Sequence, residues 1–101
     1  IGNPGQANYV SSKGAMEAFT RTIANEVAKR GITVNCVSPG FIRTDILETI
    51  DPNTLENMKK MIPCGEIGSP NDVANAVFFL TKEESSYITG QVLHVNGGLT
   101  M

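Results

Sequence analysis

The sequence predicts an α/β fold built on a parallel β-sheet. Helical and strand-like segments alternate along the chain, in the order helix, strand, helix, strand. Both strand-like segments are short and apolar, and glycine or proline bounds each of them. Parallel strands need a long crossover connection, usually a helix, so this alternation favours a parallel sheet over an antiparallel one.

The first helix is expected from about Tyr9 to Arg30, after a loop over residues 1–8. Apolar residues recur in it at spacings of three and four, which predicts a buried stripe of Met16, Phe19, Ile23 and Val27. A second stripe consists of small residues on another face: Ser11, Ala15, Ala18 and Thr22. Such a stripe fits a contact between subunits and equally a contact between helix and sheet. Gly31 is expected to end the helix as its C-terminal cap.

Two strands are expected, over Ile32–Val37 and Gly90–Val95. The first is short and rich in β-branched residues, as a buried parallel strand is. The first ends at Pro39-Gly40, and the second is followed by Asn96-Gly97-Gly98.

Two further helices are expected between the strands. Asp51-Pro52 indicates a helix start, and a thin apolar face follows, made of Leu55, Met58 and Ile62. The later helix has clearer signals. Ser69 suits the cap, Pro70 the first helical position and Asp72 the positive end of the helix. Its core stripe is predicted to be Val73, Val77 and Leu80.

Domain organisation follows from the shortage of strands. A parallel sheet covered by helices needs more than two strands, and the first residues, Ile1–Gly5, are loop-like. We therefore expect residues 1–101 to be the C-terminal part of one larger domain.

Composition argues against several classes of function. The net charge is −2 without a basic run, which argues against nucleic-acid binding. No apolar run has the length of a membrane span. Cys36, Cys64 and the single histidine, His94, do not form a metal-binding pattern, and reduced thiols fit a reducing compartment.

Tyr9 and Lys13 form the candidate catalytic pair. A spacing of four residues places both side chains on one face of a helix. An unperturbed phenol has a pKa near 10, and a neighbouring ammonium that favours the phenolate helps a phenol donate its proton near neutral pH. A single Tyr-x-x-x-Lys match is weak evidence, so the interpretation depends on its context.

That context resembles the C-terminal half of the short-chain dehydrogenase/reductases. The matching motifs are Tyr9-x-x-x-Lys13, Asn35-x-x-Ser38-Pro39-Gly40 and Asn96-Gly97-Gly98. Within that superfamily the chain is most similar to the 3-oxoacyl-[acyl-carrier-protein] reductases, over the stretches Asn3–Tyr9, Gly31–Asn35 with Pro39–Ile42, and Tyr87–Gln91 through Val95–Gly98.

The resemblance implies a Rossmann-type, doubly wound parallel sheet and a reaction. The reaction is reduction of a 3-oxoacyl thioester on acyl carrier protein, with hydride from NADP(H), or NAD(H) as the alternative, and a proton from Tyr9. Lys13 and Tyr9 would bind the nicotinamide ribose. Pro39, Gly40, Ile42 and Thr44 match the segment that lines the cofactor, with the Ile42 backbone holding the carboxamide; Thr44 also reads as an ordinary turn residue.

The resemblance extends to weaker positions. Gln6 matches a substrate-facing residue, although a loop amide can simply satisfy its own backbone. Arg30 matches a position that contacts the acidic carrier protein, and it equally suits the negative end of a helix dipole. His94 is interpreted as structural. The variable substrate loop of the family corresponds to the segment around Leu47–Met61.

The same resemblance implies a homotetramer in the bacterial cytoplasm or an organelle, with no nucleic-acid or membrane partner. The glycine-rich phosphate loop and the family's catalytic serine and asparagine are not in this sequence, so residues 1–101 alone are expected to be inactive. Two alternatives stay open: a reductase of another small ketone or alcohol, and a catalytically inert interaction module.

Overall fold

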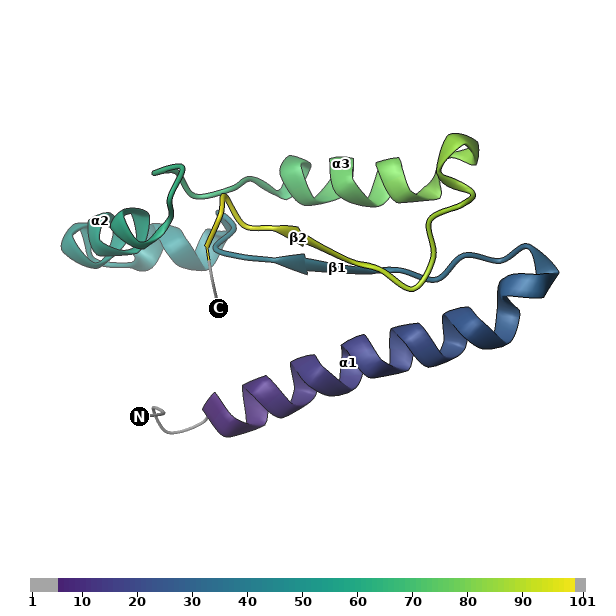
Figure 1. Cartoon of the computed structure of the whole chain (residues 1–101). Coiled ribbons are helices and arrows are strands. Elements are labelled where there is room, and N and C mark those ends of the chain that lie inside the picture. The colour runs from purple at the N-terminus through teal and green to yellow at the C-terminus, as the bar shows by residue number, and fades with distance from the viewer. Residues whose placement is uncertain (1–5, 100–101) are drawn as a thin grey trace. The chain divides into compact units, whose positions relative to one another are not determined.

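The computed structural model describes residues 6–99, with the side chains from residue 7 onward. Three α-helices and two strands occur within that range, as the sequence predicts (Figure 1). The helices are α1 (Gln6–Val27), α2 (Pro52–Met61) and α3 (Pro70–Thr81), and the strands are β1 (Cys36–Pro39) and β2 (Val92–Val95). Short 3-10 helices occupy Ala28–Arg30 (η1), Asp45–Thr49 (η2) and Glu83–Ser85 (η3).

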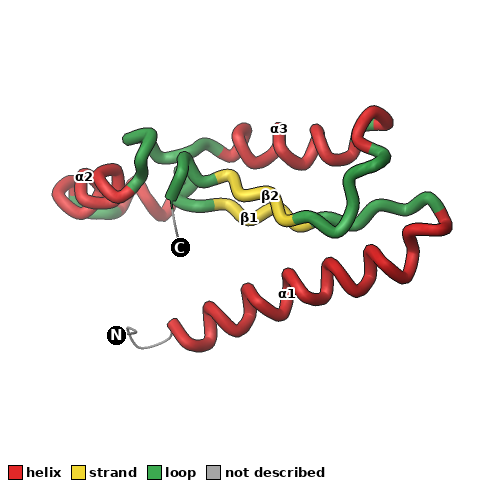
Figure 2. The backbone as a smooth tube through the Cα atoms, in the orientation of Figure 1, coloured by secondary structure: helices red, strands yellow, loops and turns green. Residues whose placement is uncertain are grey.

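The two strands pair in parallel, which confirms the predicted α/β class. The Cys36 N–H donates to the Gln91 carbonyl at 2.9 Å, and the Gly40 N–H donates to the Val95 carbonyl at 3.0 Å. Pairing therefore advances in the same direction along both segments, and the two arrows in Figure 1 point the same way. Figure 2 shows how short the strands are beside the loops that lead into them.

The predicted strand boundaries were wrong at their N-terminal ends, and β1 also continues two residues beyond its predicted end, to Pro39. Residues 32–35, expected in the first strand, precede β1, and residues 90–91 precede β2. One backbone bond joins the two segments there, from the Gly90 N–H to the Val34 carbonyl at 2.7 Å, and side chains supply the others. The Val34 N–H donates to the Thr89 hydroxyl at 3.0 Å, and the Asn35 side chain joins the Ile88 carbonyl and the Gln91 N–H. These bonds hold the two segments together without regular β pairing.

Contacts divide the chain into two compact units. Unit 1 comprises Ile1–Cys36 with Lys82–Val92, and unit 2 comprises Val37–Thr81 with Leu93–Met101. Each unit is described by itself below.

In unit 1 the start of α1 differs from the prediction. The helix already includes Gln6, so the expected loop over residues 1–8 is wrong from residue 6 onward, while residues 1–5 lie outside the described range. Gln6 and Ala7 are good helix formers and no glycine or proline follows them directly, so nothing stops the helix from starting one turn early. Tyr9 therefore lies within the helix rather than at its first residue.

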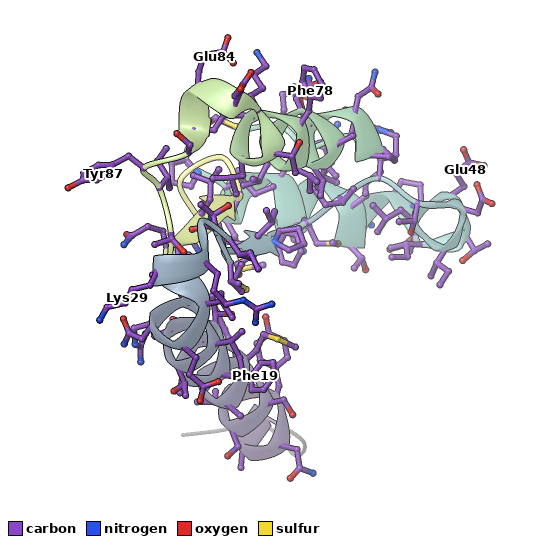
Figure 3. The ribbon with its side chains drawn as sticks, turned by 90° about the vertical axis from the view of Figure 1, so that its right-hand side faces the viewer. Phe19, Lys29, Glu48, Phe78, Glu84 and Tyr87 are labelled. Carbon is purple, nitrogen blue, oxygen red and sulfur yellow. The ribbon has the colours of Figure 1, made fainter. Side chains whose placement is uncertain are left out.

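The buried face of α1 also differs from the predicted stripe. Met16 and Phe19 are 57% and 62% exposed, and Figure 3 shows Phe19 projecting from the helix. The other two residues of the predicted stripe, Ile23 and Val27, are half-buried, and the buried positions are Thr20 and Ala24. A Cβ placed on Gly90 would lie 3.5 Å from the Ala24 Cβ, so the chain passes close to the helix at a small residue. The small-residue stripe predicted from the sequence is exposed.

The end of the helical segment is as predicted. Gly31 has φ 76°, in the left-handed region, and its N–H donates to the Ala28 carbonyl at 3.0 Å. The Ile32 N–H donates to the Val27 carbonyl at 3.5 Å. These two bonds form a Schellman motif, in which glycine is favoured because it has no Cβ.

In unit 2 the helix starts are as predicted. Asp51 precedes α2, which begins at Pro52, and Pro70 is the first residue of α3. The Ser69 hydroxyl accepts from the Asp72 N–H at 3.2 Å, and the Asp72 carboxylate accepts from the Ser69 N–H at 2.8 Å. This reciprocal pair is a capping box.

The apolar faces of these helices are confirmed in part. On α2, Leu55 and Met58 are half-buried, and Ile62, just after the helix, is buried. On α3, Leu80 is buried and Val73 half-buried, but Val77 is 45% exposed, so its assignment to the core was wrong. Ala76 takes the more covered position beside it.

The apolar core of the described residues is small. Four hydrophobic side chains are buried: Ala24, Ile62, Ile67 and Leu80. Eleven large hydrophobic residues are exposed, including Phe78 and Phe79 on α3. A large apolar surface is therefore accessible on this part of the chain.

Candidate active site

Tyr9 and Lys13 lie one helical turn apart on α1, in unit 1. The helix supplies the geometry, because residues four apart lie on the same face. Tyr9 is 50% exposed, and Lys13 is half-buried. The phenol is therefore accessible to a reacting group, and Lys13 lies on the same face of the helix.

Pro39 and Gly40 form the turn that ends β1, in unit 2. Pro39 is exposed at the last position of the strand, and its nitrogen faces away from β2, because the N–H groups of Cys36 and Gly40 are the ones that donate to the β2 segment; its missing N–H therefore costs no bond between the two strands. The next residue approaches Asn96 so closely that a Cβ on Gly40 would lie 2.6 Å from the Asn96 Cβ. Glycine is thus required where the chain leaves the strand.

Ile42 follows this turn and forms an isolated parallel bridge with Gly68. The Arg43 N–H donates to the Gly68 carbonyl at 2.7 Å, and the Gly68 N–H donates to the Phe41 carbonyl at 3.0 Å. In a parallel bridge made by the two neighbours of a residue, that residue's own N–H and C=O face the opposite side. Among the described residues nothing is hydrogen-bonded to these two Ile42 groups, so they are available to a ligand.

Thr44 comes next and is exposed, with extended backbone at φ −129° and ψ 171°. Its carbonyl accepts from the Leu47 N–H at 3.0 Å, which starts η2. Its hydroxyl has no hydrogen-bond partner within residues 6–99.

The two weaker candidates lie at opposite ends of the first helical segment. Gln6 is the first residue of α1, and its side chain lies outside the described part. Arg30 is exposed at the last residue of η1, beside Lys29. Two cations at this end complement the helix dipole, so the structural reading of Arg30 has direct support.

The structure thus presents the candidate residues as two groups. Tyr9 and Lys13 share a face of α1 in unit 1, whereas Pro39, Gly40, Ile42 and Thr44 follow one another along a single segment of unit 2.

Sequence reasoning missed two features of unit 2. One is Asn96, whose position explains the glycine at residue 40. The other is Arg43, which lines an open cleft of about 340 Å³ with residues of η2 and the start of α2. The sequence did offer a sign that Arg43 lies near the site, because it stands between the candidate residues Ile42 and Thr44. A second cleft, of about 330 Å³, includes Phe41, Cys64 and Asn96 in its lining.

Two other kinds of site are absent from the described residues. No group of three or more His, Cys, Asp or Glu side chains is placed to hold a metal ion there. No helix among them is long and apolar enough to cross a membrane. Cys36 and Cys64 form no disulfide within the part of the chain that the structure describes.

Comparison with known proteins adds the family. A family model described as "Enoyl-(Acyl carrier protein) reductase" matches residues 1–100. The 3-oxoacyl-[acyl-carrier-protein] reductase FabG of Rickettsia bellii is 54% identical over 100 residues, which are 99% of this chain and 42% of that protein. The FabG of Escherichia coli is 46% identical over 101 residues, 100% of this chain and 41% of that protein.

The chain therefore spans about two fifths of the length of these curated relatives. The family model nevertheless covers all but its last residue, and the α/β architecture with a parallel sheet agrees with it. The chain belongs to the short-chain dehydrogenase/reductase family.

Proposed function

We propose that this chain is the C-terminal part of a single dinucleotide-binding reductase domain. The domain would use NADP(H), or NAD(H) as the alternative, to reduce a 3-oxoacyl thioester on acyl carrier protein to the 3-hydroxyacyl form. The observation that carries the proposal is the accessible Tyr9 phenol one turn from Lys13 on α1. Relatives at 46–54% identity are named for this reaction, which supports the proposed activity. The described residues expose much apolar surface, which supports the proposal that they are part of a larger domain.

In the proposed reaction the bound nicotinamide supplies a hydride to the ketone carbon. Tyr9 donates its phenolic proton to the ketone oxygen, so the C=O double bond becomes a C–O single bond to a hydroxyl. The Lys13 ammonium stabilises the phenolate that remains, since an opposite charge nearby favours the ionised form. Lys13 also hydrogen-bonds the nicotinamide ribose in this proposal. A positioned acid of this kind contributes about 10²–10⁴-fold to a rate.

The second group of residues fits a nicotinamide nucleotide. Gly40 leaves no side chain where the segment leaves β1, and Pro39 precedes it. The free N–H and C=O of Ile42 are a donor and an acceptor side by side, which matches the carboxamide group. The exposed Thr44 hydroxyl is a suitable donor for a phosphate oxygen.

The partners of the whole protein are part of the proposal. Arg30 is exposed and can contact an acidic carrier protein, and Gln6 is proposed to face the substrate. Apolar side chains exposed on α1 and α3, among them Phe19 and Phe78, support assembly into a homotetramer.

One alternative activity has an observation in its favour. The matching family model is described by an enoyl thioester reduction, that is, reduction of a C=C bond. The relatives above are instead named for ketone reduction, and a phenol placed to protonate an oxygen suits the ketone better.

The test uses the full-length reductase that contains residues 1–101. The wild type is assayed with NADPH and with 3-oxoacyl or enoyl thioesters, each on acyl carrier protein, and with small free ketones. Tyr9→Phe is expected to lower kcat for the 3-oxoacyl thioester at least 100-fold, because the proton donor is removed. NADPH is still expected to bind, because the variant loses only one hydrogen bond to the ribose and keeps Lys13. Residues 1–101 alone are expected to show no turnover.

The matched control is Tyr87→Phe, which removes the phenol of the other tyrosine, a fully exposed one. It is expected to behave like the wild type. Undiminished ketone reduction by Tyr9→Phe would overturn the role of Tyr9. A wild type that reduces only free ketones or only enoyl thioesters would overturn the proposed substrate.

A further inference from the structure

Arg43 lies at an open cleft that no catalytic step above uses. The cleft has a volume of about 340 Å³ and lies wholly within unit 2. Apart from Arg43 and Glu48 its lining is apolar: Leu47, Ile50, Pro52 and Leu55. Leu47, Ile50 and Leu55 are half-buried, so they form the floor of the cleft rather than a scatter of surface side chains.

Backbone hydrogen bonds shape this cleft. The Leu47 N–H donates to the Thr44 carbonyl at 3.0 Å, and the Ile50 N–H donates to the Leu47 carbonyl at 3.2 Å. These two bonds form the turns at the start and the end of η2. The Leu55 N–H donates to the Asp51 carbonyl at 3.0 Å and closes the first turn of α2. Arg43 is anchored by its own N–H, which donates to the Gly68 carbonyl at 2.7 Å.

The Arg43 guanidinium has no ion pair or hydrogen bond among the described residues, and the residue is exposed. Glu48, the other charged residue of the lining, is exposed, and Figure 3 shows it at the outer end of this segment. A guanidinium presents N–H groups in a fork that matches phosphate oxygens. The cleft therefore offers one unpaired phosphate-binding cation beside an apolar floor.

We propose that this cleft binds the phosphate end of a phosphopantetheine arm. In that arm a phosphate ester is separated by one methylene from a carbon that bears two methyl groups. An anion and a branched apolar group thus lie next to each other, as do Arg43 and the apolar floor. The arm is shared by acyl carrier protein and coenzyme A. Arg43 accordingly determines specificity for phosphopantetheine thioesters, an inference that rests on the proposed function.

The test compares Arg43→Gln with the wild type in the full-length reductase. The substrates are 3-oxoacyl thioesters of one chain length on N-acetylcysteamine, pantetheine, phosphopantetheine, coenzyme A and acyl carrier protein. Arg43→Gln is expected to raise KM for the three phosphorylated substrates about ten-fold more than KM for the two unphosphorylated ones, as loss of a charge-assisted hydrogen bond predicts. Arg43→Lys is expected to lie in between, because it keeps the charge without the fork.

Two further variants sharpen the test. Glu48→Gln is expected to lower KM for phosphorylated substrates about two-fold, because it removes a like charge from the cleft. Arg21→Gln removes an exposed cation on α1, outside the cleft, and is expected to match the wild type on every substrate.

The outcomes separate this inference from the proposed function. Equal KM changes for phosphorylated and unphosphorylated substrates in Arg43→Gln, or a rise confined to KM for NADPH, would overturn the cleft assignment while the reductase activity stands. A wild type that reduces none of the 3-oxoacyl thioesters would instead overturn the proposed function. If Arg43→Gln raises KM for the coenzyme A thioester but not for the acyl carrier protein thioester, the carrier-bound arm lies elsewhere, and the proposal fails for the carrier substrate.

Discussion

Replacing Gly40 by alanine tests the close approach that positions the proposed cofactor segment. The new Cβ would lie 2.6 Å from the Asn96 Cβ and 3.0 Å from the Asn96 Cα. Carbon atoms prefer a separation of about 3.5–4.0 Å, so the two segments must move apart by about 1 Å. Neither Asn96 atom can rotate away, because both are fixed to the backbone. The Gly40 N–H bond to the Val95 carbonyl must stretch or break as they move.

The expected cost is about 3 kcal/mol, the upper end of the usual range for overpacking, since no flexible side chain can relax the contact. For a domain of 150–250 residues this corresponds to a fall of roughly 6–12 °C in Tm. Thermal unfolding of the full-length reductase followed by circular dichroism measures it. KM for NADPH is expected to rise as well, because Ile42 lies two residues further along the displaced segment.

Two other glycines serve as matched controls. Gly31 has open space around its Cβ position but φ 76°, so Gly31→Ala isolates left-handed strain, about 1–2 kcal/mol. Gly14 lies inside α1 with nothing within 4 Å, so Gly14→Ala is expected to stabilise by about 0.5–1 kcal/mol. A Gly40→Ala protein with a Tm within about 2 °C of the wild type would refute the steric argument.

Two further substitutions test local predictions. Ser69→Ala removes the hydroxyl that caps α3, and it is expected to lower the free energy of unfolding, measured in urea, by about 1 kcal/mol. The control Ser86→Ala, at an exposed serine after η3, should lower it by less than about 0.5 kcal/mol. Equal losses in the two variants would argue against the capping box. Lys13→Met is expected to raise the Kd for NADPH in a fluorescence titration and to lower kcat about 10²-fold or more, whereas an unchanged Kd would remove the ribose-binding role of Lys13.

Local signals in the sequence predicted local structure well. The cap at Ser69, the proline at the start of α3 and the left-handed Gly31 all depend on residues within one turn of each other. Such interactions form between chain neighbours whatever the rest of the fold does. The Tyr9 and Lys13 pair belongs to the same class, because helical spacing alone places the two side chains on one face.

Predictions that required a distant partner were less successful. The period of α1 indicated a stripe with Met16 and Phe19, but the buried face contains Thr20 and Ala24, where Gly90 approaches the helix. Similarly, β-branched residues predicted a strand from Ile32, while β1 begins only at Cys36, and the Asn35 side chain binds the backbone of residues 88 and 91.

The residues alone were enough to predict the α/β class, the three α-helices and two strands found within residues 6–99, the Gly31 and Ser69 caps, and the candidate catalytic pair. Contacts between distant segments set which face of α1 is buried, where β1 and β2 begin, why residue 40 is glycine, and that Arg43 lines a largely apolar cleft. The difference lies in how far apart along the chain the interacting residues are. Helix starts, helix ends and helical spacing depend on groups a few residues apart, whereas burial, strand register and clefts arise between segments separated by tens of residues in the chain.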